Sequence, residues 1–415
     1  MFRTALLTYV LLLLFFCAGA AKPLSGPLPN TAPYPLSNTA FTLSSNTAFT
    51  LSSNTAFTLS SNAAPYPTDD DSATYFYKNH EYGSMALVNP WQMVLSGSFD
   101  ILQLDGKDRR LLKKPYGIGF ENVWKNVTSP GAAISQIGWG KWLTTEVLPL
   151  NLTPAGAQWI PNYQLHLIGG GMSYRMLSEW YRDQGVAGAD WWSAGTVMFM
   201  HVLNEAVENE DYRGYNTDPI ADVLLFDWLG ILLFTNDDVS QFFGETLHMR
   251  DWSNINMITF PDVQLGNNGL YYSMKWNIPS TDRWRVFYLM GMSNMAGASY
   301  RTDDEHSVTV AAGIRGRNLV NVDSTVRQLT LNIVPTAGVF WDRNHSLLAS
   351  LTVSGQADQS AILQLYPGLV KGLPIDFSIW AMYGTTGGFG AGIGVRLLPG
   401  LGYRMNTTTT KYRLP

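Results

Sequence analysis

Apolar and polar residues alternate strictly along much of the C-terminal half of the chain. In the stretch 269–278, Leu270, Met274 and Ile278 lie on one face, and Ser273 and Lys275 lie on the other. A period of two residues over about ten positions predicts antiparallel β-strands, and about 9–11 residues suffice for a tilted strand to cross a membrane. The same period recurs in the stretches 307–315, 328–333, 346–354, 374–383 and 390–398.

The residues on the second, polar face of these strands help to distinguish a soluble β-sandwich from a membrane β-barrel. A soluble sandwich would carry charged residues there, whereas this chain carries mostly Ser, Thr, Asn, Gln and Gly, and only 14% of its residues are charged. Small polar residues suit the interior of a membrane barrel, and Trp276, Trp284, Trp341 and Trp380 suit the aromatic girdles at its two rims. We therefore expect a mainly β fold, an antiparallel transmembrane-type β-barrel of about 8–12 strands, in preference to a soluble β-protein.

The period changes to a helical one between the early and the late strands. The stretches 91–102 and 134–147 are predicted as early strands. Four segments are predicted as helices: 172–185, 192–210, 219–234 and 237–249. The domain is thus expected to carry three to four helices as an insert over 160–250. Apart from the N-terminus, no run of 18 clean apolar residues predicts a spanning helix.

The N-terminus reads as an export signal followed by a spacer. Arg3, an apolar core and the small residues Ala18–Ala20 predict a signal peptide over 1–21; a lipoprotein signal at Cys17 and an uncleaved anchor helix are weaker alternatives. Residues 22–74 contain the repeat NTAFTLSS and predict a disordered linker, with a binding or β-pairing arm as the alternative. The folded barrel domain is expected over 75–415, and its end, TTTTKYRLP, lacks the terminal aromatic residue usual in bacterial barrels.

The amino-acid composition limits the classes of partner that the chain is expected to bind. The net charge of −5 and the lack of a basic patch exclude nucleic acid as an expected partner. A barrel implies contact with membrane lipid and with the outer-membrane assembly machinery. Cys17 is the single cysteine, so the mature chain is expected to have no disulfide and no thiol ligand. Neither G-x-S-x-G, nor a Walker sequence, nor H-E-x-x-H occurs.

Acidic residues and histidines on the predicted helices are the candidates for chemistry. His201, Glu205 and Glu208 follow one another at i, i+4 and i+7 and so share one face of a helix. Such a cluster suits acid–base catalysis, for which the candidates are His166, His201, Glu205, Glu208, Asp218 and Asp222. It also suits a divalent metal, for which they are His201, Glu205, Glu208 and Asp222. No other cofactor is expected.

Structural roles explain several of the same residues. Asp218 before Pro219 is expected as a helix N-cap, and Asp222 near the helix start is favoured by the helix dipole. Asp227 is five residues from Asp222 and is expected to point elsewhere. The acids would then form the polar face of helices within or beneath a barrel, with Leu224, Leu225, Trp228 and Ile231 on the apolar side.

Four segments resemble an uncharacterised domain-of-unknown-function group of secreted proteins from Gram-negative bacteria. They are 162–181, 204–209, 218–234 and 251–253, so the resemblance covers roughly 160–300. It implies an outer-membrane location and a helical insert in a barrel. It brings no established activity and no catalytic residue.

Two function classes follow from the sequence. The first is an outer-membrane barrel that is plugged or acts as a scaffold and handles a lipid or small solute. The alternative is a membrane-embedded hydrolase or transferase that acts on lipid or envelope glycan through the histidine–carboxylate cluster.

Overall fold

The computed structural model describes residues 40–42, 50–52, 73–149, 160–321, 329–369, 377–396 and 398–405. Two compact units result, one that includes Thr74–Pro415 and one of Ala21–Ala73. In the second, β1 (Ala40–Thr42) pairs antiparallel with β2 (Thr50–Ser52), so one eight-residue repeat pairs with the next. The remainder of the predicted linker, the predicted signal peptide and the C-terminal tail lie outside the described residues, and their predictions stay predictions.

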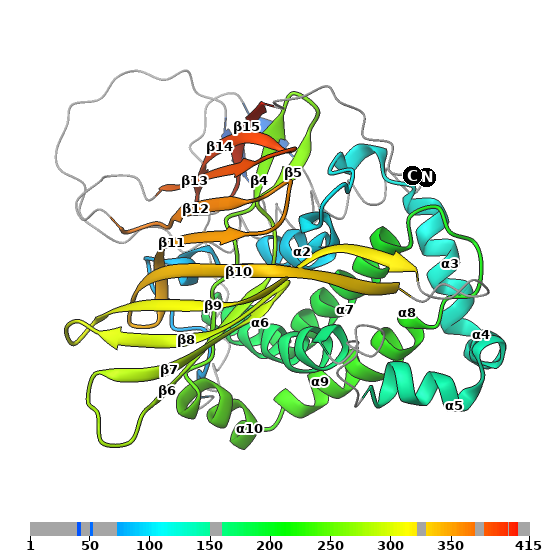
Figure 1. Ribbon diagram of the computed structural model, residues 1–415, viewed down its shortest axis with the longest axis horizontal. Coiled ribbons are helices and arrows are strands. Elements are labelled where there is room, and N and C mark those ends of the chain that lie inside the picture. The colour runs from blue at the N-terminus through cyan, green and yellow to red at the C-terminus, as the bar shows by residue number, and fades with distance from the viewer. Residues whose placement is uncertain are drawn as a thin grey trace. The chain divides into compact units, whose positions relative to one another are not determined.

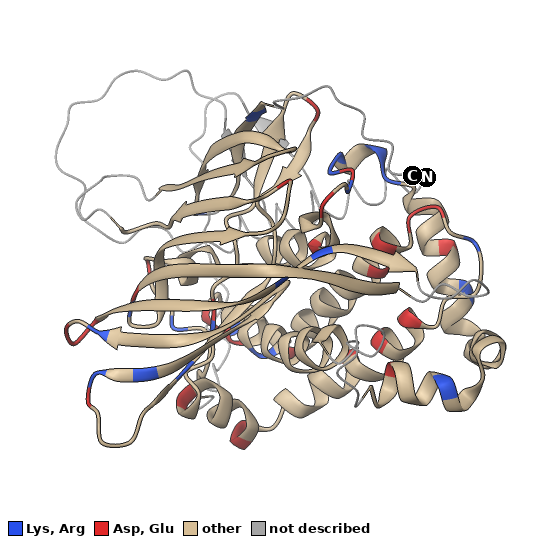
Figure 2. Ribbon diagram, in the orientation of Figure 1, with Lys and Arg blue, Asp and Glu red and all other residues tan. Residues whose placement is uncertain are grey.

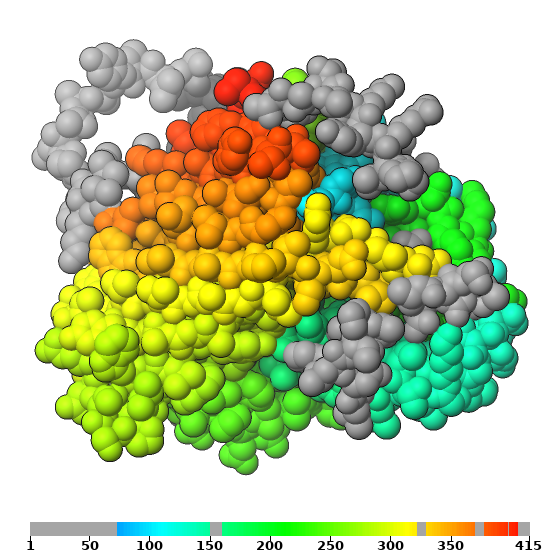
Figure 3. Space-filling view, viewed as in Figure 1, coloured from blue at the N-terminus to red at the C-terminus, as the bar shows by residue number. Residues whose placement is uncertain are grey.

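The larger unit is built around a mixed sheet of 13 strands. The strands from β6 to β15 pair in sequence order, each antiparallel to the next, and they follow one another as neighbouring bands in Figure 3. Their bounds are β3 Arg250–Asp251, β4 Met257–Phe260, β5 Gln264–Gly266, β6 Tyr271–Asn277, β7 Trp284–Gly291, β8 Ser293–Arg301, β9 His306–Asn321, β10 Leu329–Arg343, β11 Ser346–Ser354, β12 Ala361–Leu365, β13 Phe377–Gly384, β14 Gly388–Val395 and β15 Leu398–Met405.

One short segment, 250–260, is attached to both ends of this run of strands; we call it the closing segment. Its first part, β3, pairs antiparallel with β6, and the Trp252 amide continues the ladder by donating to the Tyr271 carbonyl at 2.8 Å. Its last part, β4, pairs in parallel with β15, with Phe260 opposite Tyr403. The expectation of a purely antiparallel sheet is therefore wrong at this one pair.

The inner face of the sheet is filled by side chains from strands far apart in its order. Phe287 on β7 and Phe340 on β10 have ring centroids 5.6 Å apart, and Trp252 of the closing segment contacts both, at 5.3 and 5.5 Å. Trp380 on β13 belongs to the same core and is fully buried, so it is not one of the exposed rim residues expected from the sequence. The sheet therefore curls around its own core.

The outer face of the sheet carries a continuous row of apolar residues, which we call the apolar belt. Each member is the cross-strand partner of the next across β6 to β15 and on to β4, and most are exposed. Between them the inward residues Ser299, Thr309 and Ser378 are at most 1% exposed, so the polar residues face inward as predicted. The belt comprises Trp276, Val286, Ala298, Val310, Val339, Leu351, Leu363, Ala381, Ala391, Tyr403 and Phe260.

All described helices of this unit precede its sheet in the chain and pack together in Figure 1. They contact the face of β6 that carries Tyr272, whereas its neighbour Tyr271 points into the sheet's inner core. The α-helices are α2 Pro90–Ser98, α3 Tyr116–Thr128, α4 Pro130–Ile137, α5 Trp139–Trp142, α6 Gly171–Asp183, α7 Ala189–Asn209, α8 Asp218–Ala221, α9 Asp227–Phe234 and α10 Asp237–Gln241. Short 3₁₀ turns occupy Ser84–Leu87, Asp100–Gln103 and Leu111–Lys113, and π-helical segments occupy η4 Leu143–Val147, η6 Ile160–Gly170, η7 Asp222–Phe226 and η8 Phe242–Thr246.

The two early strands predicted from the sequence are wrong, because both stretches are helical. At 91–102, Asn89 caps α2 by accepting the Gln92 amide at 3.0 Å, and Pro90 fills the first helical position. At 134–147, Pro130 starts α4 and Gly138, with φ 89°, separates it from α5. Helices occupy most of 160–250 as expected, but they begin already at residue 84, and no described strand of this unit precedes them. The later helices are confirmed to within a few residues, although Thr217, not Asp218, is the N-cap residue of α8.

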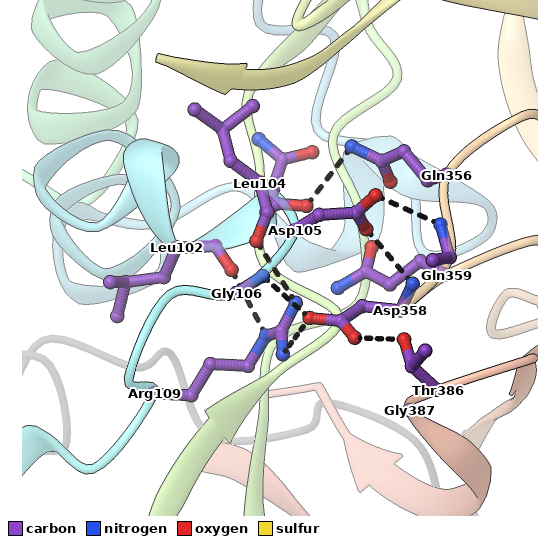
Figure 4. Close-up of polar contacts among 12 residues, drawn as sticks. Leu102, Leu104, Asp105, Gly106, Arg109, Gln356, Asp358, Gln359, Thr386 and Gly387 are labelled. Atoms are coloured by element: carbon purple, nitrogen blue, oxygen red, sulfur yellow. Dashed lines mark hydrogen bonds and ion pairs between the residues drawn. The ribbon is translucent and has the colours of Figure 1, made fainter. Parts of the chain in front are cut away.

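Polar contacts fix the first part of this unit against the helices and the sheet. Glu179 on α6 is buried and accepts the backbone amides of Tyr75, Phe76 and Tyr77 at 2.7–2.8 Å. Figure 4 shows a second set, in which Asp105 accepts the amides of the turn after β11 and Asp358 of that turn accepts the Gly106 amide. These reciprocal carboxylate–amide bonds join loops that lie far apart in the sequence.

Charge is sparse on the visible strands and concentrated on helices and turns (Figure 2). Among the described residues, no helix is both long enough and apolar enough to cross a membrane.

Candidate functional site

Three helical elements meet around a buried group of histidines and carboxylates. The π-helical segment η6 provides His166, α7 provides His201 and Glu205, and the run from η7 into α9 provides Asp222 and Asp227. All five residues are at most 6% exposed.

Glycines allow these elements to approach closely. A Cβ atom on Gly230 would lie 2.5 Å from the Leu167 carbonyl oxygen, and one on Gly171 would lie 2.3 Å from the Phe234 ring. Gly170 faces His201, whose Nε2 atom would lie 3.2 Å from an added Cβ. The three glycines at 169–171, where η6 continues into α6, are thus required by packing, because side chains there would push His166 away from α7 and α9.

Three atoms form a tight triangle at the centre of the cluster. The Asp227 Oδ1 atom lies 2.9 Å from His166 Nδ1 and 2.8 Å from His201 Nδ1. The two Nδ1 atoms lie 2.7 Å apart, and the imidazole rings meet edge to face with centroids 4.6 Å apart. On the other side of the His166 ring, Nε2 lies 3.5 Å from Asp222 Oδ2, so His166 stands between two carboxylates.

A π-helical turn places both aspartates on the same side of the helix. In an α-helix, residues five apart point about 140° away from each other. Here the Asp227 amide donates to the Asp222 carbonyl, the i→i+5 bond of a π-helix. The expectation that Asp227 points elsewhere is therefore wrong, because it assumed α-helical spacing.

The two aspartates have opposite electrostatic environments. Burial raises the pKa of Asp222 well above its ordinary value, and the nearby carboxylates of Asp218 and Glu205 raise it further. Burial would also raise the pKa of Asp227, but His201 and His166 outweigh that effect and lower it to about 2. Burial lowers the pKa of His166, against the attraction of Asp227. The cluster thus combines one carboxyl group whose pKa is lowered with one whose pKa is raised, the kind of opposed environments that acid–base sites use.

The structure brings together only part of the predicted set. His166, Glu205 and Asp222 offer ligand atoms within 4.8 Å of one another, as do His166, His201 and Asp227. Glu208 and Asp218 are half-buried and belong to neither group. Asp227, which the sequence interpretation set aside, is the residue that joins the two histidines.

A small cavity adjoins the histidines. Its volume is about 50 Å³, enough for a few water molecules, and Asp100 forms part of its wall. Burial raises the pKa of Asp100 to about 8. Within the described part of the chain, His201 Nε2, Asp222 Oδ1 and Asp227 Oδ2 are buried without a hydrogen-bond partner. The cavity is lined by Gly97, Asp100, Leu165, His166, Met200, His201, Asn204, Leu270 and Tyr272.

The helical run that carries the aspartates has its apolar side outward. Leu224, Trp228, Leu229 and Leu232 are 42–67% exposed, whereas Asp222 and Asp227 are buried. Leu224 and Trp228 thus lie on the side opposite the acids, whereas Ile231, expected on the same apolar side, is buried. The acids face the other helices because they meet His166 and His201 there.

A scan against protein-family models, a search of curated proteins and a search of solved structures each find no match for this chain.

Proposed function

We propose that this protein is an outer-membrane β-barrel protein whose barrel anchors a helical region in the membrane, and that the chemistry is carried out by the histidine–carboxylate cluster of that region. The observation that carries the proposal is the apolar belt on the outer face of the strands from β6 to β15, whose members alternate with buried residues, some polar, such as Ser299 and Thr309, and some aromatic, such as Phe340 and Trp380. Lipid-facing barrels have this polarity, and a water-exposed apolar surface of this extent would be an aggregation hazard.

Two further observations support the same environment. The exposed residues Leu224, Trp228, Leu229 and Leu232 extend an apolar surface onto the helices. The closing segment pairs with part of β6 and with part of β15, and paired strand edges are what a lipid environment demands.

The packed inner face of the sheet favours a scaffold over a solute pore. Phe287, Phe340 and Trp380 fill that face, and a cavity among these inward side chains has a volume of about 20 Å³. The histidine–carboxylate cluster with its adjoining cavity is instead the place where a reaction on a lipid or envelope glycan would occur, by proton transfer between groups of opposed pKa.

A charge placed on the apolar belt tests the membrane assignment. Leu351 lies mid-strand on β11, opposite Val339 and Leu363. If this face meets lipid, Leu351→Arg lowers the free energy of unfolding in bilayers by about 2–4 kcal/mol. The matched control is Asp304→Arg, at an exposed position between β8 and β9, which changes it by less than about 0.5 kcal/mol.

Membrane fractionation and a heat-modifiability gel on the unaltered protein complete the test. The expected result is a detergent-requiring protein in the outer-membrane fraction whose gel mobility changes on boiling. A protein that stays soluble without detergent, with Leu351→Arg as harmless as Asp304→Arg, would contradict the proposal.

A further inference from the structure

We propose that His166, His201 and Asp227 bind a divalent first-row transition-metal ion through His166 Nδ1, His201 Nδ1 and Asp227 Oδ1. This inference rests on the proposal that the cluster is the chemical centre, and it adds the cofactor class. It is independent of the membrane assignment, because metal content and location are measured separately.

Hydrogen bonds alone cannot satisfy the triangle of three atoms. A carboxylate oxygen only accepts, and each Nδ1 carries at most one proton. If both nitrogens are protonated, both donate to Asp227 Oδ1 and two N–H groups face each other at 2.7 Å. If only one is protonated, at least one side of the triangle joins two lone pairs. An ion above the triangle accepts all three lone pairs at once.

The three distances between the candidate ligand atoms fit octahedral coordination better than tetrahedral coordination. Ligand atoms about 2.1 Å from an ion are about 3.0 Å apart on a face of an octahedron and about 3.4 Å apart in a tetrahedron. The observed separations are 2.7, 2.8 and 2.9 Å. Two imidazoles and one carboxylate on one octahedral face leave the remaining positions open, the arrangement of mononuclear sites that bind and activate a further ligand.

The surrounding groups fit the same site. Metal coordination by Nδ1 puts the proton of each imidazole on Nε2, and His166 Nε2 points toward Asp222 Oδ2 at 3.5 Å. A carboxylate behind a metal-bound histidine orients the ring and raises its basicity. The cavity beside His166 and His201 offers room for the water molecules or the substrate atoms that would occupy open positions.

Metal analysis of the full-length, detergent-solubilised protein tests the proposal. The expected content is close to one equivalent of metal, which chelation removes with a lower melting temperature and which added Zn²⁺, Mn²⁺ or anaerobic Fe²⁺ restores. Loading with Co²⁺ should give the weak visible absorption of a six-coordinate ion. Wild-type protein that, after chelation, neither binds these ions nor gains thermal stability from them overturns the inference, and this measurement needs no variant.

Variants locate the ligands. Asp227→Asn and His201→Gln should each lower metal affinity at least about 100-fold, and Asp222→Asn about 10- to 100-fold, as expected for a residue behind a ligand. Glu208→Gln, on the same helix as His201 but outside the cluster, is the matched control and should leave affinity unchanged. Equal losses of metal affinity in Glu208→Gln and Asp227→Asn would overturn the assignment of these ligands. A protein that binds metal but is not in the membrane would refute the membrane proposal alone.

Discussion

Asp100 is the acidic side chain in the wall of the cavity beside the histidines. Asp100 is partly exposed at its surface, although protein atoms surround it. This burial is the largest cause of its pKa, which is raised to about 8. The Gln103 side chain donates to its carboxyl group. At neutral pH a protonated Asp100 would be a hydrogen-bond donor next to the cluster.

The raised pKa of Asp100 makes the stability of the protein depend on pH. Below pH 3.8 the carboxyl group is protonated in both the folded and the unfolded chain. Above that value the unfolded chain ionises while the folded protein keeps its proton, so the free energy of unfolding falls until about pH 8. Asp100→Asn should remove this contribution to the pH dependence of the free energy of unfolding.

Unfolding measured across that range in wild type and Asp100→Asn checks the prediction. Since Asn cannot ionise, the variant should gain stability relative to wild type as the pH rises. Parallel pH profiles for the two proteins would show that Asp100 keeps an ordinary pKa.

The sequence predicts four of the five cluster residues and misses Asp227. His201 and Glu205 were identified because they are four residues apart on one helix. Asp222 and His166 were candidates as well. Asp227 was set aside because nothing in the sequence indicates that its helix contains a π-turn, which shifts every following residue around the axis.

At the scale of elements, the contact between η6, α6 and α9 depends on glycine. Gly171 is the first residue of α6, and Gly230 lies across from it on α9. An added Cβ on Gly171 would come within 2.6 Å of the Gly230 carbonyl oxygen. The backbones of the two helices are therefore in direct contact, and this contact sets the distance between His166 and Asp227.

Gly171→Ala should consequently destabilise the protein by about 1–3 kcal/mol, as overpacking of a tight interface does. The control is Gly117→Ala in α3, where an added Cβ meets nothing within 4 Å; it should be neutral or stabilising by up to about 1 kcal/mol. Thermal or urea unfolding of the two variants gives the comparison. Equal effects would mean that the α6–α9 contact is looser than described.

Periodicity predicted elements well where one face is apolar and the other polar. The strand at 346–354 matches β11, Ser346–Ser354, because its two faces meet different surroundings. Strands β7 and β8 were not predicted. The stretch 91–102 also alternates, yet it forms α2, because the Asn89 cap and Pro90 set a helix start and the helix is buried on nearly all sides.

At the scale of the whole unit, the closing segment joins the two ends of the run of strands from β6 to β15. The sequence indicated a barrel but not this connection, since a parallel pair between β4 and β15 has no local pattern. A chain with Cys17 as its single cysteine allows a direct test.

Phe260→Cys combined with Tyr403→Cys should form a disulfide on mild oxidation, because these exposed residues are register partners on neighbouring strands. The oxidised protein should migrate faster on a denaturing gel, and reductant should reverse the change. Phe260→Cys with Ile393→Cys is the control, because β14 is one strand further away, about 10 Å. Efficient crosslinking of the control pair, or none of the first, would contradict the connection.

The closing segment also joins parts of the chain that lie far apart in the sequence. β4, Met257–Phe260, precedes its partner β15, Leu398–Met405, by most of the strands of the sheet. Until the two strands pair, β4 keeps an unpaired edge, which is prone to wrong pairing, and a pairing so distant in sequence forms slowly. A chain that stops at residue 397 would lose few residues and yet lack the partner of β4, so a late truncation would leave nearly the entire sheet present and unable to join its ends.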